Sequence, residues 1–91
     1  MKVIQSRIFE RKVKKLSKPQ KAQLDEAIRE ILRNPAIGEQ EKGELKMVFV
    51  HKFRIDHMLF LLSYAFTPEI LELIMLGPHE NYYKDLKNYL K

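Results

Sequence analysis

The chain has 91 residues, of which 45% are hydrophobic and 32% are charged, and these proportions are typical of one globular domain with a single core. It contains no cysteine, which excludes disulfides and thiolate metal sites, and no apolar run approaches the roughly 18–20 residues that span a bilayer. We therefore expect one domain over residues 1–91, located in the cytoplasm and not in a membrane.

The net charge of +5 is concentrated near the N-terminus. Residues 1–21 contain eight lysine or arginine residues against the single acid Glu10. Such a field favours anionic partners, namely nucleic acid, a ribosome or an acidic protein. The alternative interpretation is an ordinary solvated helix face.

The first part of the chain predicts a strand and a helical hairpin. Lys2–Gln5 alternates apolar and polar residues, and Ser6 is placed to cap a helix that ends near Leu16. Ser17-Lys18-Pro19-Gln20 has the pattern of a capping box with proline in the first turn. Asn34-Pro35 ends this second helix, because the residue before a proline avoids the α conformation.

After a loop over residues 35–44, the pattern predicts three strands joined by short turns. These strands cover Leu45–Ile55, Met58–Phe66 and Ile70–Leu76. The second is apolar on both faces, which predicts a central position in the sheet. A final helix is expected to follow Gly77, with Pro78 in its first turn.

The predicted fold class is therefore α+β. It has the order β-α-α-β-β-β-α, with the N-terminal strand and the helical hairpin packed on a small antiparallel sheet. Consecutive strands with short turns pair in antiparallel fashion. We expect the opening strand to pair at an edge or beside the last strand.

Candidate functional residues occur first on the strand 45–55. Lys46, Lys52 and Arg54 share one face by the period of two, and successive residues on that face are about 6.6 Å apart. This spacing suits a phosphate group. The alternative is a wet sheet face with no ligand.

The second group of candidates lies where the last strand meets the last helix. A neutral imidazole at His79 can exchange a proton with a 2′-hydroxyl or a leaving oxygen, and the helix dipole would disfavour its charged form. Tyr82 has core spacing to Leu86, whereas Tyr83 points elsewhere and is the candidate for contacting a base or phosphate. Lys84 is a further candidate phosphate ligand. These residue types indicate metal-free phosphodiester chemistry without a cofactor, if the protein is an enzyme.

Several segments resemble a toxin of the RelE/ParE superfamily, the growth-arresting half of a bacterial type II toxin–antitoxin pair. They include Lys14-Lys15-Leu16, Asn34-Pro35-Ala36-Ile37-Gly38-Glu39 and Lys52-Phe53-Arg54. The most specific is Leu76-Gly77-Pro78-His79-Glu80-Asn81-Tyr82-Tyr83-Lys84-Asp85-Leu86-Lys87. The resemblance covers nearly the whole chain.

The resemblance implies two alternative activities. RelE-like members cut mRNA in the ribosome with basic strand residues and a C-terminal basic or imidazole group plus a tyrosine, which match Lys52, Arg54, His79 and Tyr83. Leu61 departs from this pattern, because it stands where the family has a strand arginine. ParE-like members instead poison DNA gyrase by protein–protein contact.

We expect an mRNA interferase, that is, an RNA-binding endoribonuclease that inhibits translation, with gyrase poisoning as the alternative. A third interpretation is a basic nucleic-acid-binding domain without toxicity. The resemblance also implies a cognate acidic antitoxin, which would lie over the basic sheet face or replace the C-terminal helix and bury Lys52 and Arg54.

Overall fold

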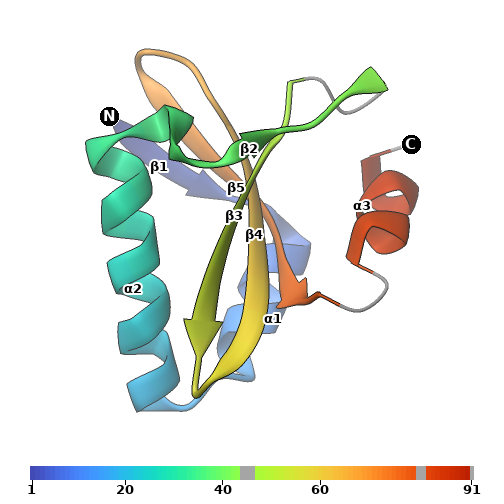
Figure 1. Ribbon diagram of the computed structural model, residues 1–91. Coiled ribbons are helices and arrows are strands. Elements are labelled where there is room, and N and C mark those ends of the chain that lie inside the picture. Colours follow the sequence, from blue (N-terminus) through green and yellow to red (C-terminus); the bar gives the residue numbers. More distant parts are fainter. Residues whose placement is uncertain (44–46, 80–81, 91) are drawn as a thin grey trace.

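The computed structural model describes residues 1–43, 47–79 and 82–90 and shows a five-stranded sheet with helices on both sides (Figure 1). The strands are β1 (Lys2–Gln5), β2 (Glu39–Gln40), β3 (Phe49–Ile55), β4 (Met58–Phe66) and β5 (Ile70–Pro78). The helices are α1 (Arg7–Lys14), α2 (Lys18–Arg33) and α3 (Tyr82–Leu90), with a 3₁₀ turn η1 (Pro35–Ile37) after α2. Within the described ranges, no helix has the length and apolar character needed to cross a membrane.

The strand order is β1-β5-β4-β3-β2, so β4 is central, as its apolar sequence predicts. The pairs β2–β3, β3–β4 and β4–β5 are antiparallel, and β1 joins the edge of β5 in parallel. The predicted α+β order is confirmed. The short strand β2 was not predicted, because a strand of two residues is too short to show an alternation.

The helical hairpin begins at the predicted caps. The Ser6 hydroxyl accepts a hydrogen bond from the Phe9 N–H at 3.1 Å. Ser17 and Gln20 form both hydrogen bonds of a capping box. These bonds fix where the chain turns, because the first N–H groups of a helix have no partner within it.

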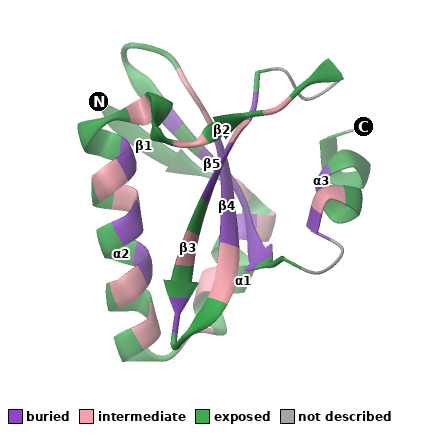
Figure 2. Cartoon of the chain, viewed as in Figure 1, coloured by how far each residue is buried: buried purple, intermediate pink, exposed green. Residues whose placement is uncertain are grey.

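The two faces of the sheet carry two separate hydrophobic clusters, and α2 and α3 lie on opposite sides (Figure 1). We call the side covered by α1 and α2 the hairpin face, and the side covered by α3 the α3 face. The hairpin-face cluster includes Phe9, Leu24, Ile31, Leu62 and Tyr64. Buried residues follow the middle strands and the side of α2 that faces them (Figure 2).

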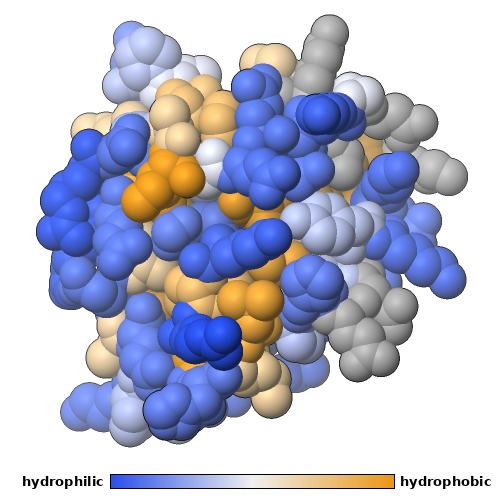
Figure 3. Space-filling model, viewed as in Figure 1, coloured by the Kyte–Doolittle hydropathy of each residue, from blue (hydrophilic) through white to orange (hydrophobic). Residues whose placement is uncertain are grey.

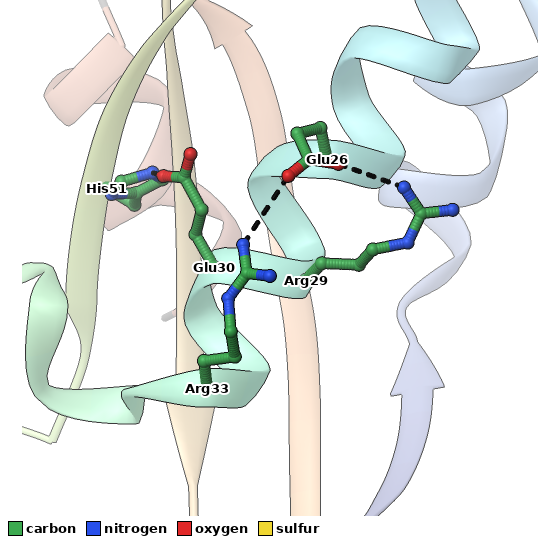
Figure 4. Close-up of polar contacts among 5 residues, drawn as sticks. All are labelled: Glu26, Arg29, Glu30, Arg33 and His51. Carbon is green, nitrogen blue, oxygen red and sulfur yellow. Dashed lines mark hydrogen bonds and ion pairs between the residues drawn. The ribbon is translucent and has the colours of Figure 1, made fainter.

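The outer surface of α2 is polar (Figure 3), and three of its charged residues pair with each other. Glu26 accepts hydrogen bonds from Arg29 at 3.0 Å and from Arg33 at 3.4 Å (Figure 4). On the inner side, Glu30 lies 3.4 Å from Nε2 of the buried His51. His51 is thus a buried histidine, and its Nε2 has no hydrogen-bond partner among the described residues.

A β-bulge in β5 shapes the α3 face. Ser63 pairs with Met75, whereas the next residue, Tyr64, pairs with Leu73, so Ile74 is the extra residue. Ile74 and Met75 both belong to the α3-face cluster, because a bulge sets two successive side chains on one side. The Ser6 hydroxyl donates to the bulged Ile74 carbonyl at 2.6 Å.

Tyr82, the first residue of α3, closes the opened ladder at this bulge. Its hydroxyl accepts a hydrogen bond from the Ser63 N–H at 2.9 Å and donates to the Met75 carbonyl at 2.7 Å. The hydroxyl also lies 2.9 Å from the Ser63 side-chain oxygen. The predicted core role of Tyr82 is confirmed, since only 3% of its surface is exposed.

The last helix begins later than the sequence predicts. Pro78 is the final residue of β5 and pairs with Phe60, and the described part of α3 begins at Tyr82. Proline is tolerated at a strand end, where its missing N–H removes no interior ladder bond. His79 therefore precedes the described helix and does not lie within its first turn.

We predict that Tyr82→Phe lowers the free energy of unfolding by about 1–3 kcal/mol, because the Ser63 N–H and Met75 carbonyl lose their buried partner. Urea denaturation measures this change. Tyr89→Phe is the control, since that side chain is 42% exposed. Equal stability of Tyr82→Phe and the unmodified chain would show that the hydroxyl bridge is not needed.

Stability is also predicted to fall above about pH 10, the ordinary pKa of tyrosine. Burial raises the pKa of Tyr64 and, more strongly, that of Tyr82. A raised native pKa gives stability that is complete below the unfolded value and is lost as the pH rises beyond it. In urea titrations between about pH 9 and 11, Tyr82→Phe should lose less stability than the unmodified chain; an identical loss in both would contradict this prediction.

Candidate functional site

The two cations predicted on β3 lie on the α3 face. Lys52 pairs with Leu61 and Arg54 pairs with Leu59, and both cationic residues are exposed. Within the described ranges, no carboxylate lies within ion-pair distance of Lys52. Its ammonium group is therefore available to an anionic ligand.

Arg54 is held at the tip of the β3–β4 hairpin. Its guanidinium donates to the His57 carbonyl at 2.9 Å. Asp56 and His57 have φ values of 49° and 71°, and a turn with two such residues suits the twist of a two-residue hairpin. Arg54 also lines a shallow hollow of about 300 Å³ between β3 and α2. This hollow is on the hairpin face, so the Arg54 side chain lies at the edge of the sheet, where the two faces meet.

The same turn is fastened to the start of α2. Gln20 and Gln23 donate to the Asp56 carboxylate at 2.8 and 3.0 Å. The Asp56 N–H in turn donates to the side-chain oxygen of Gln23 at 3.0 Å. The hydrogen bonds from Gln23 and Gln20 to the carboxylate lower the pKa of Asp56, and the bond from Gln23 has the larger effect. The helical hairpin thus sets the position of the strand end that carries Arg54.

The sheet brings the end of β5 near Lys52. Lys52 pairs with Leu61, which pairs with Gly77 on the next strand. Strands in a sheet are about 4.8 Å apart, so the α-carbons of Lys52 and Gly77 are roughly 10 Å apart. His79 follows Gly77 by two residues, and its side chain is exposed. Lys52 and the end of β5 that leads to His79 therefore lie near each other on the α3 face.

His79 and Tyr83 lie side by side at this end. Their ring centroids are 6.4 Å apart and the rings meet edge to face at 81°. Tyr83 also meets the ring of Tyr82 at 5.8 Å. The anchored Tyr82 thereby fixes the Tyr83 ring, which in turn contacts the imidazole.

Two carboxylates that the sequence analysis did not single out lie near Tyr83. Burial raises the pKa of the Tyr83 phenol, and the negative charges of Glu41 and Glu39 raise it further. A hydrogen bond with Glu41 acts in the same direction. Tyr83 is therefore a neutral hydrogen-bond donor near pH 7. Glu39 and Glu41 fall in residues 35–44, which the sequence predicts as a loop, because the two-residue strand β2 is too short to show an alternation.

Leu61, at the position that resembles a strand arginine of RelE-like toxins, lies beneath α3. It is 0% exposed and packs in the α3-face cluster with Tyr82 and Leu86. The centre of this face is thus occupied by an apolar helix contact. The predicted cations Lys52 and Arg54 lie on β3, beside this contact, and no predicted cation lies within it among the described residues.

The remaining candidates are less well placed or lie outside the described ranges. Lys84 is exposed on α3, next to Tyr83. Lys46 belongs to residues 44–46, whose structure is not described. Over the described ranges, no three histidine or acidic side chains are grouped so that they could hold a metal ion.

Comparison with known families identifies the protein class. A family described as the ParE-like toxin of type II bacterial toxin–antitoxin systems matches residues 3–87. The chain belongs to this family. It is therefore a toxin of the RelE/ParE superfamily, as its C-terminal segment indicated. A search of curated protein sequences found no match.

Solved toxin structures share the fold. The chain is 17% identical to a mutant of the E. coli toxin RelE in the free state, with a TM-score of 0.72 over 97% of this chain and 90% of the other. It is 20% identical to a chain of the intact E. coli RelBE toxin–antitoxin complex, with a TM-score of 0.69 over 87% and 96% of the two chains. A YoeB/ParE toxin from Agrobacterium tumefaciens is 20% identical, with a TM-score of 0.64 over 87% and 99%.

We predict that Leu61→Arg, at the position that resembles a strand arginine of RelE-like toxins, destabilises this toxin by about 3 kcal/mol or more. The guanidinium would enter a fully buried site against Tyr82 and Leu86, where an unpaired charge is costly. Thermal or urea unfolding measures the loss. Leu59→Arg is the control, because Leu59 is only half-buried. Full stability of Leu61→Arg would show that α3 readily leaves this position.

Proposed function

We propose that this toxin is a ribosome-dependent endonuclease that cuts mRNA without a metal ion. The supporting observation is that Lys52, which pairs with no carboxylate of the described residues, lies near the end of β5 that leads to the His79–Tyr83 pair. Arg54 adds a second cation at the edge of that face. This set can bind a phosphodiester and move a proton, which are the two requirements of the reaction.

In the proposed reaction, the mRNA supplies its own nucleophile. His79 takes the proton of a 2′-hydroxyl, and the 2′-oxygen attacks the adjacent phosphorus. The bond from phosphorus to the 5′-oxygen breaks, and that oxygen receives the proton from the His79 imidazolium. The products are a 2′,3′-cyclic phosphate and a 5′-hydroxyl. Imidazole suits both proton transfers because it exchanges protons near neutral pH.

The cations and the tyrosine have separate roles in this proposal. Lys52 and Arg54 neutralise the negative charge that grows on the phosphate oxygens in the transition state. Tyr83, a neutral donor, hydrogen-bonds a phosphate oxygen or packs against a base. Lys84 and Lys46 bind flanking phosphates. The half-buried Tyr83 ring also holds the imidazole in place through their edge-to-face contact.

We further propose that a cognate acidic antitoxin neutralises the toxin at the α3 face. Solved structures of RelE include complexes with its antitoxin RelB. In α3 of this chain, only Tyr82 and Leu86 are buried, whereas Tyr89 and Leu90 are 42% and 41% exposed. An antitoxin segment could therefore cover Lys52 and Arg54 or take the place of α3.

Gyrase poisoning is the second candidate, and two observations favour it. Leu61 removes the cation that RelE-like cleavage would use at the centre of the face, and its position is closed by α3. Glu39 and Glu41 also place negative charge beside Tyr83, which opposes phosphate binding there. The α3 face carries charges of both signs and is covered by a helix. Such a surface suits a protein partner better than the phosphate backbone of a nucleic acid.

Pulse labelling of bacteria that express the toxin separates the two candidates. An mRNA endonuclease stops amino-acid incorporation first, because translation fails as mRNA is cut. A gyrase poison stops thymidine incorporation first and causes DNA breaks. Normal protein synthesis during growth arrest would exclude the ribosome proposal.

We predict that His79→Ala lowers mRNA cleavage on purified ribosomes by about 100-fold or more, as expected for loss of a proton-transfer group. Primer extension on a defined mRNA measures the cleavage. His57→Ala is the matched control, because His57 is an exposed histidine of the hairpin turn. Equal cleavage by His79→Ala and the unmodified toxin would show that this imidazole only supports the structure.

A further inference from the structure

Helix α1 carries a row of cations on the side away from the sheet. Arg7, Arg11 and Lys14 recur at i, i+4 and i+7 and are all exposed. Phe9, which packs in the hairpin-face cluster, lies on the opposite side of the helix, together with Val13. We call Arg7, Arg11 and Lys14 the α1 row. It spans about 10 Å along the helix axis.

The whole net charge of the protein comes from this part of the chain. Residues 7–21 contain seven lysine or arginine residues and the single acid Glu10, a net charge of +6, whereas the whole chain has +5. The rest of the chain is therefore close to neutral. The strongest electrostatic feature of the toxin lies on the hairpin and not at the candidate active site.

The α1 row has no internal partner that would explain it. Glu10 lies between these residues in sequence, yet no carboxylate of the described segments is within ion-pair distance of Arg7, Arg11 or Lys14. The arginines of α2 differ, because Glu26 binds both Arg29 and Arg33. The helix dipole favours Arg11 and Lys14, which lie in the last turn of α1, but it does not account for Arg7, the first residue of the helix, where a cation is unfavourable.

The chemistry of the surface selects the partner. The exposed residues of α1 include no aromatic side chain, and single-stranded nucleic acid is commonly bound by stacking its bases on aromatic rings. They also include no large apolar side chain, whereas a protein partner commonly buries such residues at the centre of its interface. A double helix of RNA is recognised mainly through its shape, phosphates and 2′-hydroxyls, which long cationic side chains can reach.

We propose that the α1 row binds the phosphate backbone of a double-stranded RNA segment. The choice of RNA over DNA rests on the proposed function, in which the toxin acts at the ribosome. The single-stranded mRNA would then occupy the α3 face while a structured RNA docks on α1. The two surfaces are formed by different elements, so one RNA-binding step can be impaired without the other.

The test compares two double variants with equal charge. Arg7→Gln with Arg11→Gln removes two unpaired arginines of α1, and Arg29→Gln with Arg33→Gln removes two arginines that Glu26 already binds. Both changes lower the net charge from +5 to +3. Glutamine keeps a high helix propensity, and urea denaturation of each variant verifies its fold.

Binding of a labelled RNA stem of about 20 base pairs is measured by fluorescence anisotropy at several salt concentrations, without ribosomes. The α1 variant should bind about tenfold or more weakly at about 0.1 M salt. The slope of the logarithm of the binding constant against the logarithm of the salt concentration is negative. Its magnitude should decrease by about 2, since each lost phosphate contact removes about 0.9. The α2 variant should keep the affinity and slope of the unmodified toxin.

Four results would overturn the proposal. They are unchanged binding by the α1 variant, an equal loss in both variants, equal affinity for a DNA duplex of the same length, and tighter binding to a polyglutamate peptide. The last would identify an acidic protein as the occupant. Because the assay contains neither ribosomes nor mRNA, its outcome is independent of the pulse-labelling result that tests the proposed function.

Discussion

The buried hydroxyl of Tyr82 is the contact on which the α3 face depends. A bulge in β5 opens the β4–β5 ladder at Ile74, and the phenol bridges the Ser63 N–H and the Met75 carbonyl that the bulge separates. Both groups would otherwise be buried without a good partner, which is costly in a low-dielectric interior. One side chain thus satisfies the sheet and anchors the first turn of α3.

The position of α3 explains the arrangement of the candidate site. Seating Tyr82 in the sheet sets Leu86 over Leu61 and turns the neighbouring Tyr83 towards His79 and Glu41. The same helix therefore assembles the imidazole–phenol pair and closes the place where the family has a strand arginine. This packing requires an apolar residue at position 61, because burying an unpaired cation beneath α3 would be energetically costly.

The charge of the toxin is divided between surfaces with different chemistry. On the α3 face, Glu39 and Glu41 lie near Tyr83, and Glu39 pairs with Val50, two residues before Lys52 on β3, so cations and carboxylates share this face. On α1 the cations face solvent, and no carboxylate in the described part of the chain pairs with Arg7, Arg11 or Lys14. The cations of the helical hairpin would thus attract a polyanion over a long range. The residues on the sheet would bind the group that reacts.

Local patterns in the sequence determined the elements of this protein, while its tertiary structure decided the site. Capping residues and strand alternation predicted the helical hairpin, the central strand and the core role of Tyr82, because these depend on neighbours close in the chain. The bulge, the late start of α3 and the carboxylates beside Tyr83 were not predicted. They arise from contacts between segments that are far apart in the sequence, and no local periodicity reports how such segments meet.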